Sequence, residues 1–333
     1  MLEHGGALRA AAACYDIPLV EWLDLSTGIN PNGWPVPGLP ATVWQRLPEP
    51  EDGLVVVASA YYGTAHLLPV AGSQAAIQAL PLLRPCGRVG VLHPTYAEHA
   101  YAWRRAGHEV EHLTVEQLAV ALDRFNTVVV VNPNNPTGLR FSPAVLLDWR
   151  ERLAARAGWL VVDEAFMDAT PNDSLASYVG LPGLIVLRSL GKFYGLAGAR
   201  AGFALAEPAV LERLSEALGP WTVSGPGRWV TMQALADVPW QQQARLALAQ
   251  ASQRLADLLH GHGLTVAGGT TLFQWVPLAE AEFWQAALAQ RGLLVRRFTD
   301  PLGLRFGLPD SDVAWRRLEL ALAAVRAERL GGL

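Results

Sequence analysis

The feature that most constrains the fold is a series of short apolar runs, each ended by a turn signal or a polar cluster. They are only a few residues long, rich in β-branched side chains and apolar on both alternating faces. Such runs are typical of strands buried between two helical layers. The five runs span residues 88–94, 127–133, 158–164, 183–189 and 200–207.

Helical segments separate several of these runs. The clearest spans residues 142–157, where Ser142 suits the N-cap and Pro143 the first helical turn. The alternation of strands and helices predicts an α/β domain with a mainly parallel sheet between helical layers.

The pattern changes after residues 220–227, and a smaller α+β domain is expected downstream. A chain of 333 residues exceeds one typical domain, so a second one is reasonable. We predict an N-terminal segment over 1–35 that closes over the active site, a large domain over 36–225 and a small domain over 226–333. The expected elements of the small domain are a long helix at 228–262, strands within 265–278, at 292–298 and at 303–309, and helices at 280–291 and 311–330.

Composition excludes several classes of protein. Apolar residues make up 51% and charged residues 17% of the chain, as in a compact globular enzyme. The net charge of -4, without a long basic run, argues against a nucleic-acid partner. Cys14 and Cys86 lack metal-ligand spacing and are expected to be buried thiols in a reducing compartment, with no metal. With neither a targeting signal nor a long apolar run, we expect a cytoplasmic protein without a membrane partner.

Polar residues follow the predicted strands where each strand ends. In open parallel sheets, ligands bind beyond the carboxyl ends of the strands. Each of these residues taken alone is explained by an ordinary cap, turn or packing role. Their occurrence in series favours a binding site instead. They are Gly72, Ser73 and Gln74 at a helix start, which is a ready anion site, then Tyr96, Asn132, Asn134, Asn135, Asp163, Glu164, Ser189, Lys192 and Arg200.

The segments AGSQ, HPTY, NPNNPTG, VVDEAF and SLGKFYGLAGARAG occur in this order over most of the chain. The series resembles the fold-type-I pyridoxal-5'-phosphate (PLP) enzymes, in the branch that contains histidinol-phosphate aminotransferase. The resemblance implies the fold of that group, a large domain with a mainly parallel sheet plus a small α+β domain. It also implies PLP as cofactor.

The resemblance assigns a role to each residue type. Lys192 would be the catalytic residue, because a primary amine can bond covalently to the PLP aldehyde and later shuttle a proton. Asp163 would keep the pyridine nitrogen protonated, Asn135 would bond the ring O3', and Tyr96 would stack on the ring face. The cofactor phosphate would be held by Gly72, Ser73, Gln74, Ser189 and Arg200.

Two departures from the resemblance are visible. Many aminotransferases of this branch have tyrosine where this chain has Phe166, so one hydroxyl partner of O3' is missing. A neighbouring subunit usually supplies a tyrosine to the cofactor phosphate, yet the corresponding region here carries Leu47. Either Tyr61 or Tyr62 takes its place, or this contact is absent. A homodimer is expected from the resemblance alone.

The two ends of the chain bear on the reaction. The N-terminal EHGG and the segment WLDLSTGINPNG (22–33) resemble the L-threonine-O-3-phosphate decarboxylases of cobalamin biosynthesis. This implies a phosphorylated amino acid as substrate, decarboxylated to (R)-1-aminopropan-2-yl phosphate for the cobalamin nucleotide loop. The substrate contacts would be His4, Gly5, Gly6, Gly28, Asn30, Arg296 or its neighbour Arg297, and Arg305.

Two other functions stay open at this point. A histidinol-phosphate-type aminotransferase would need an oxo-acid or glutamate for turnover. A non-catalytic PLP-fold sensor of the kind found in transcription factors would carry a basic DNA-binding domain ahead of the enzyme-like part. Here that part begins almost at the first residue, and the chain is mildly acidic.

Overall fold

The computed structural model describes residues 4–331 and divides into two compact units. The large unit comprises Gly33–Asn135 and Leu139–Gln243, and the small unit comprises Met1–Asn32, Pro136–Gly138 and Ala244–Leu333. These boundaries differ from the expected ones at 35 and 225. The N-terminal segment groups with the C-terminal residues because its strand joins their sheet, and the second boundary falls inside a long helix.

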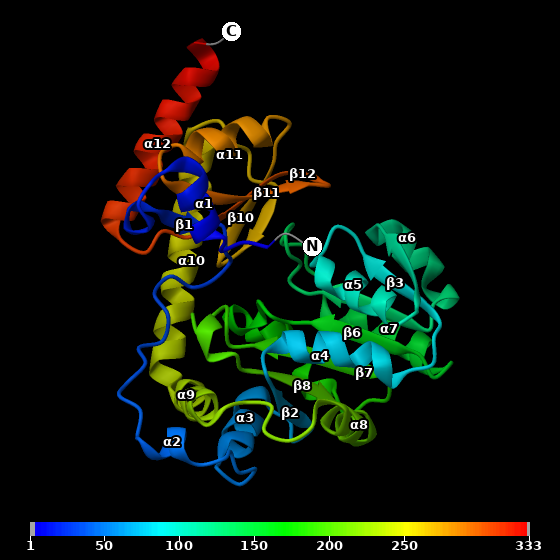
Figure 1. The fold of residues 1–333 in the computed structure, drawn as a ribbon. Coiled ribbons are helices and arrows are strands. Elements are labelled where there is room, and N and C mark those ends of the chain that lie inside the picture. Colours follow the sequence, from blue (N-terminus) through cyan, green and yellow to red (C-terminus); the bar gives the residue numbers. More distant parts are fainter. Residues whose placement is uncertain (1–3, 332–333) are drawn as a thin grey trace. The chain divides into compact units, whose positions relative to one another are not determined.

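The large unit is built on a seven-stranded sheet with the order β2-β8-β7-β6-β5-β3-β4 (Figure 1). Strand β8 is antiparallel to both of its neighbours, and the other pairs are parallel, as the sequence predicts. The strands are β2 (Leu67–Val70), β3 (Arg88–Leu92), β4 (Glu109–Leu113), β5 (Thr127–Val131), β6 (Trp159–Asp163), β7 (Leu184–Ser189) and β8 (Gly202–Ala206).

Helices cover both faces of this sheet. Apolar side chains of α4, α5 and α8 pack with Val129, Val161 and Leu187 in one buried cluster, which defines one face. Helix α7 begins as expected, with the Ser142 hydroxyl accepting from the Val145 amide at 3.4 Å. The helices of the unit are α2 (Thr42–Gln45), α3 (Leu54–Tyr62), α4 (Ser73–Ala79), α5 (Ala97–Arg105), α6 (Val115–Ala121), α7 (Pro143–Ala154), α8 (Pro208–Leu218) and α9 (Gly225–Ala236).

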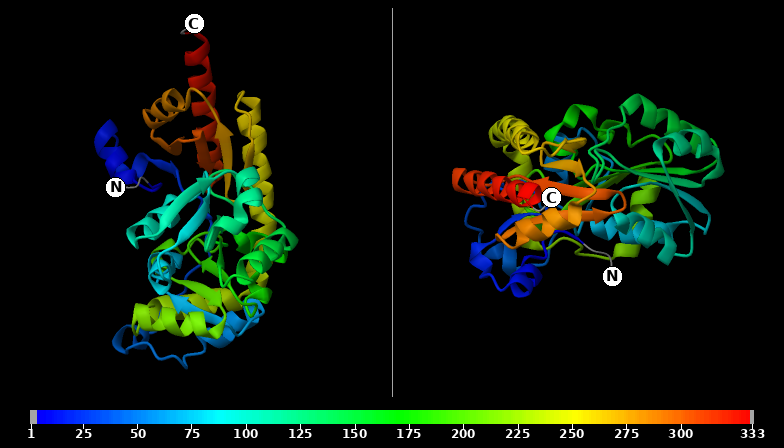
Figure 2. Two further views of the ribbon diagram at one scale, coloured as in Figure 1. Left: turned by 90° about the vertical axis from the view of Figure 1, so that its right-hand side faces the viewer. Right: turned by 90° about the horizontal axis from the view of Figure 1, so that it is seen from above.

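The small unit has a five-stranded sheet with the order β1-β11-β12-β10-β9. Its edge strand β1 (Leu23–Leu25) is parallel to β11 (Leu293–Thr299), although the two lie at opposite ends of the chain. Both views in Figure 2 show α11 (Ala281–Ala289) alongside α12 (Asp312–Gly331). The remaining elements are α1 (Leu8–Tyr15), α10 (Val238–Gly261), β9 (Gly268–Thr270), β10 (Phe273–Pro277) and β12 (Leu302–Gly307).

The loop after β5 is shared between the units. Residues Pro136–Gly138 group with the small unit, whereas Asn135 belongs to the large one. Gly138 has φ +73°, and a Cβ added there would lie 2.2 Å from the Gly269 nitrogen. Only glycine tolerates both this backbone conformation and this approach.

Two predictions about local structure are wrong. The expected long helix at 228–262 is two helices, because the chain breaks at Asp237, whose carboxylate accepts from the Trp34 indole at 3.0 Å. Cys14 and Cys86 are exposed rather than buried, because the one lies on the outer side of α1 and the other in the turn before β3. Among residues 4–331, no helix has the length and apolar character needed to cross a membrane.

Candidate active site

The start of α4 lies against Arg200 in the large unit. Gly202 pairs with Val70 on one side and Ser189 on the other, so β8 brings these strand ends together. Gly72 has φ +70°, and a Cβ added there would lie 2.8 Å from Arg200 Nη2. A guanidinium, a serine hydroxyl and the amides of a helix start therefore gather at one edge of the sheet, a donor set suited to a phosphate.

Tyr96 is positioned at the start of α5 by polar contacts with α4. Its hydroxyl donates to Gln74 Oε1 at 3.3 Å, and Gln74 Nε2 in turn donates to Glu98 Oε2 at 2.8 Å. Burial, followed by the nearby Glu98, raises the pKa of Tyr96 to about 12. The phenol is therefore neutral at physiological pH. Gln74 holds the aromatic ring in place, a role that its motif position did not reveal.

Asp163 ends β6 and is buried, with 3% of its surface exposed. Its Oδ1 accepts from the Ala165 amide at 3.0 Å, and its Oδ2 lies 2.9 Å from Nε2 of His99, which is 1% exposed. Sequence reasoning missed His99. Its signal was the spacing of three residues from Tyr96, which places both at the start of one helix.

The asparagine cluster after β5 separates into two roles. The side chain of Asn132 exchanges hydrogen bonds with the backbone of Phe141, at 2.9 and 3.2 Å. Asn134 donates to the Pro94 carbonyl at 2.8 Å and accepts from the Thr95 hydroxyl at 2.7 Å. Both are buried and shape the loop, whereas Asn135 is half-buried and remains the candidate for a ligand contact.

Lys192 lies in the loop after β7 and is half-buried. Its Nζ is 5.7 Å from the centroid of the Phe166 ring, which is itself buried. The Lys192 carbonyl accepts from the Gly195 amide at 3.1 Å, which closes the turn. The primary amine thus faces an apolar ring where a tyrosine would have presented a hydroxyl.

In the small unit, the HGG segment is bound to the segment that follows β1. The Gly6 amide donates to Ser26 Oγ at 2.7 Å, and Ser26 Oγ donates to Asp24 Oδ1 at 2.6 Å. A Cβ added to Gly5 would lie 2.4 Å from the Ser26 carbonyl oxygen. The two sequence signals from the N-terminal region are therefore one interlocked structure.

Two arginines face each other across the β11–β12 pair, where Arg296 is directly opposite Arg305. Arg305 is 6% exposed, and its Nη2 donates to the Ser26 carbonyl at 2.6 Å. Burial, and then the charge of Arg296, lowers the pKa of Arg305 to about 10. Arg296 reaches the His4 carbonyl at 3.4 Å and lies over the Phe298 ring. Two like charges held this close favour an anion between them.

Three further residues of the small unit were predicted to contact the substrate: Gly28, Asn30 and Arg297. Gly28 and Asn30 are buried, and the Asn30 side chain accepts from the Asn32 amide at 3.0 Å. Arg297 instead pairs with Glu282 at 3.2 Å. Because successive strand residues point to opposite faces, Arg297 lies on the other side from Arg296, and only Arg296 remains a candidate.

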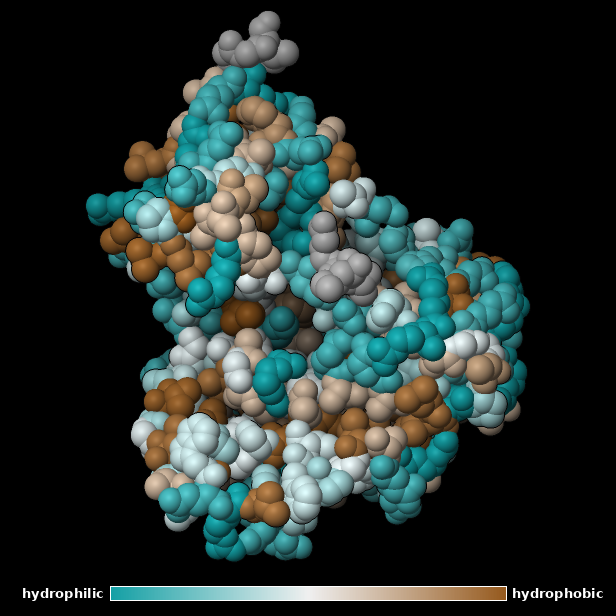
Figure 3. Space-filling view, in the orientation of Figure 1, coloured by the Kyte–Doolittle hydropathy of each residue, from teal (hydrophilic) through white to brown (hydrophobic). Residues whose placement is uncertain are grey.

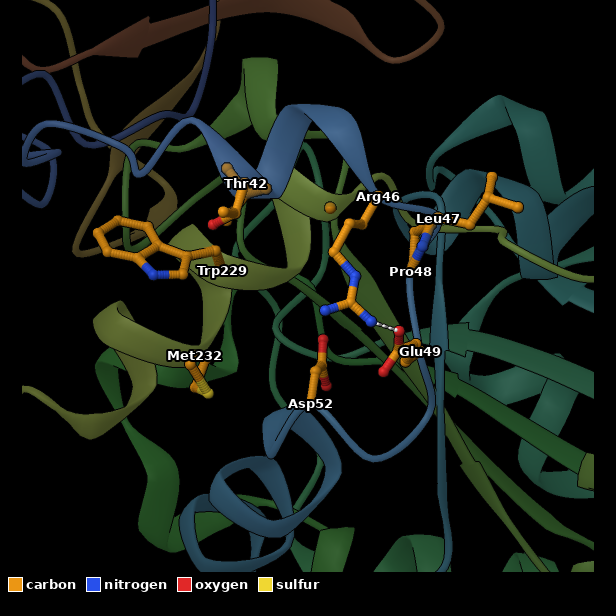
Figure 4. Close-up of a pocket in the computed structure, with 10 residues that line it drawn as sticks. Thr42, Arg46, Leu47, Pro48, Glu49, Asp52, Trp229 and Met232 are labelled. Atoms are coloured by element: carbon orange, nitrogen blue, oxygen red, sulfur yellow. Dashed lines mark hydrogen bonds and ion pairs between the residues drawn. The ribbon is translucent and has the colours of Figure 1, made fainter.

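A separate pocket of about 190 Å³ lies within the large unit (Figure 4). It contains the Arg46–Glu49 ion pair and Asp52, which pairs with Arg228 at 2.6 Å. Leu47, which occupies the family's tyrosine region, is one of the residues that line it. The lining residues are Thr42, Val43, Arg46, Leu47, Pro48, Glu49, Asp52, Gly225, Trp229 and Met232, and none is a predicted site residue.

Tyr61 and Tyr62 were suggested in place of the tyrosine that a neighbouring subunit usually supplies, but only an accessible side chain can reach another subunit. Tyr62 is buried in its own unit, with the Arg188 guanidinium 4.9 Å from the centre of its ring. Tyr61 donates to Asp168 Oδ1 at 3.1 Å. Tyr62 is therefore wrong as a residue that reaches another subunit.

The model of the aminotransferase class I and II family matches residues 58–319. The chain belongs to this family. Among solved structures, it is similar to histidinol-phosphate aminotransferase from Sinorhizobium meliloti in complex with pyridoxal-5'-phosphate. The TM-score is 0.84 and the identity 22%, over 98% of this chain and 96% of the other. The predicted fold class is confirmed.

Two curated relatives are closer in sequence. Threonine-phosphate decarboxylase from Pseudomonas aeruginosa is 56% identical, over 97% of each chain. Threonine-phosphate decarboxylase from Sinorhizobium sp is 41% identical, over 97% of this chain and 98% of the relative.

Proposed function

We propose that the large unit binds PLP. The support is the fit of its residues: a donor set around Gly72 and Arg200, a buried carboxylate at Asp163, and the amine of Lys192. Gly72 adds support, because its φ of +70° favours glycine and its backbone lies against the Arg200 guanidinium. A solved structure with the same fold, histidinol-phosphate aminotransferase from Sinorhizobium meliloti, is in complex with this cofactor.

We further propose that the reaction is the decarboxylation of L-threonine O-3-phosphate, as part of cobalamin biosynthesis. The observation that carries this proposal is the 56% identity to a threonine-phosphate decarboxylase along 97% of both chains. The interlocked Gly5–Gly6 and Ser26 segments add support, because they turn the N-terminal signal from a tail into an ordered part of the small unit.

The residues of the large unit would divide the chemistry among them. When bound, PLP supplies a carbonyl for the substrate amine and a ring that accepts the electron pair left by CO2. Asp163 would hold a proton on the pyridine nitrogen, because a buried carboxylate strongly favours a cation beside it. His99 would fix the direction of that carboxylate. Lys192 would deliver a proton to the substrate Cα after CO2 has left.

The residues of the small unit would orient the substrate. Its two anionic ends, carboxylate and phosphate, call for two cationic anchors, and Arg296 and Arg305 provide them. His4 and the Gly5 amide would complete the grip on the phosphate, while the Gly6 amide, bound to Ser26 Oγ, would hold the segment in place. Since only a bond perpendicular to the ring is broken, these anchors would select the carboxylate over the α-hydrogen.

An assay of CO2 release tests the reaction. Purified enzyme with PLP and L-threonine O-3-phosphate should release CO2 and form (R)-1-aminopropan-2-yl phosphate without any oxo-acid. Strict dependence on an oxo-acid would instead identify an aminotransferase, and PLP binding without turnover would identify a sensor. The Lys192→Ala variant should lose the visible absorbance of the bound cofactor, and a colourless wild type in the presence of PLP would refute the cofactor proposal.

We also propose a homodimer. Figure 3 shows brown apolar residues on the surface among teal polar ones, and Trp44 and Leu47 at α2 are 69% and 65% exposed. A single exposed apolar side chain is ordinary, but two large ones only three residues apart are a candidate part of an interaction surface. Sedimentation should give twice the 35.9-kDa chain mass, and Trp44→Asp with Leu47→Asp should give the monomer. Val313→Asp, at an exposed position of α12, is the control. A monomeric wild type would refute the proposed homodimer. The cytoplasmic location stays a prediction.

A further inference from the structure

A buried ion cluster lies behind the proposed cofactor site in the large unit. Arg188 is 1% exposed, and Glu164 and Asp168 are 0% exposed. Arg188 Nη1 donates to Glu164 Oε2 at 2.6 Å, and Nη2 donates to Asp168 Oδ1. One guanidinium thus connects two carboxylates that no solvent reaches.

Polar neighbours complete the cluster. Glu164 accepts from the Ser174 hydroxyl at 2.6 Å and from the Leu175 amide at 2.7 Å. Asp168 accepts from the Tyr61 hydroxyl, and the Arg188 guanidinium lies over the Tyr62 ring. The cluster carries two negative charges and one positive charge, all inside the protein.

The cluster is adjacent in sequence to the proposed site on both strands. Glu164 directly follows Asp163 at the end of β6, and Arg188 directly precedes Ser189 at the end of β7. Asp163 is paired with Leu187, so Glu164 and Arg188 are neighbours across the same strand pair.

The two groups point to opposite faces of the sheet. Val161 and Leu187 belong to the buried cluster with α4 and α5, and Asp163 contacts His99 of α5 on that face. Because successive strand residues alternate, Glu164 and Arg188 point to the other face. The ion cluster therefore leaves the cofactor face clear while it holds the backbone that carries Asp163 and Ser189.

Stability alone does not account for this arrangement. Buried ion pairs are costly to desolvate, and apolar replacements of similar volume often stabilise a protein as well or better. What the paired charges add is a fixed geometry, since Arg188 presents its donors in a rigid fork. We propose that Arg188 is a positioning residue that fixes the ends of β6 and β7, and with them Asp163 and the Ser189–Lys192 segment. This role rests on the proposed binding of PLP.

The test uses a charge-compensated variant, because Arg188→Met alone would strand two buried carboxylates. Arg188→Met combined with Glu164→Gln and Asp168→Asn removes every charge and keeps the shapes similar. We expect its apoprotein to fold, to exchange the amides of residues 189–195 faster than wild type, and to bind PLP more weakly by roughly tenfold or more. Exchange in β3 and β5 should not change.

Two further variants make the result decisive. Arg188→Lys keeps the charge and loses the fork, and it replaces the triple variant if that protein does not fold. Leu153→Ala, a fully buried position of α7, lowers stability without touching the cluster and should leave PLP affinity unchanged. Wild-type PLP affinity and wild-type exchange in a folded cluster variant would overturn the proposal. Failure of the wild type to bind PLP would count against the proposed function instead. The amide-exchange measurement on the apoprotein would still test whether Arg188 holds residues 189–195 in place.

Discussion

Replacement of Arg305 by methionine should impair substrate binding without lowering stability. The fold lowers the pKa of Arg305 from its ordinary value to about 10, mainly by burial. One pKa unit corresponds to about 1.4 kcal/mol, so holding this charge costs the folded state about 3 kcal/mol near neutral pH. Loss of the 2.6 Å hydrogen bond to the Ser26 carbonyl would cost about 1.5–3 kcal/mol. The two contributions nearly cancel, and the free energy of unfolding should stay within about 1 kcal/mol of wild type.

The pH dependence has a definite sign. Between about pH 10 and 12.5 the unfolded chain binds a proton at Arg305 that the folded protein has released. The cost of the charge is therefore fully present below about pH 9, and it is relieved as the pH rises through 10. Any advantage of Arg305→Met in urea denaturation of the apoprotein should accordingly shrink above about pH 10.

The kinetic arm separates function from stability. Removal of a charged anchor for an anion should raise the KM for L-threonine O-3-phosphate about 100-fold, at about 1.4 kcal/mol per tenfold. The control is Arg326→Met, which removes an exposed arginine contact to the Gly261 carbonyl at 2.9 Å and should leave KM unchanged. A loss of more than about 3 kcal/mol in Arg305→Met, as expected when a buried ion pair is broken, would refute this reasoning.

Three further outcomes follow from the contacts. Ser26→Ala removes the acceptor of the Gly6 amide. It should raise the KM by up to about tenfold, if roughly 1.4 kcal/mol is lost, with a smaller change in kcat. An unchanged KM would show that the HGG segment does not act on the substrate. His99→Phe removes the 2.9 Å partner of Asp163 and should weaken PLP binding in an equilibrium titration. A PLP affinity equal to that of the wild type would show that the His99–Asp163 pair does not contribute to cofactor binding. Gly138→Ala should lower the urea midpoint by the equivalent of about 2–4 kcal/mol, because its φ is positive and its backbone contacts that of residue 269. The control is Gly38→Ala, which has open space around it and should not lower the midpoint. Similar midpoints for the two variants would contradict the close approach at Gly138.

Much of the large unit could be predicted because its signals are local. Each β-branched run became a strand, since a run apolar on both faces has few other stable environments. The strand ends then converged because parallel strands bring their carboxyl ends to one edge. The sequence therefore predicts Asp163, Ser189 and Lys192 at one edge of the sheet.

The missed features depend on long-range contacts. The spacing of His99 from Tyr96 is a weak signal, because many helical residues share it, and its 2.9 Å approach to Asp163 is what assigns it a role. The break at Asp237 had a local signal in Pro239, and the contact of Asp237 with Trp34, more than two hundred residues away, accompanies it. Arg188 was part of a predicted strand, and nothing local shows that it bridges two carboxylates. Cys14 and Cys86 were assigned by residue type, whereas their exposure depends on which side of an element they occupy.

The NPNNPTG loop couples Asn135 to the small unit by the shortest possible linkage. Asn135 belongs to one unit, while Pro136 belongs to the other and is followed by the glycine that packs against residue 269. Adjacent Cα atoms stay about 3.8 Å apart, and the proline ring leaves little freedom at that joint. Any displacement of the small unit thus reaches Asn135 through a single peptide bond. Inserting even a few flexible residues after Asn135 would replace that single peptide bond with a compliant linker.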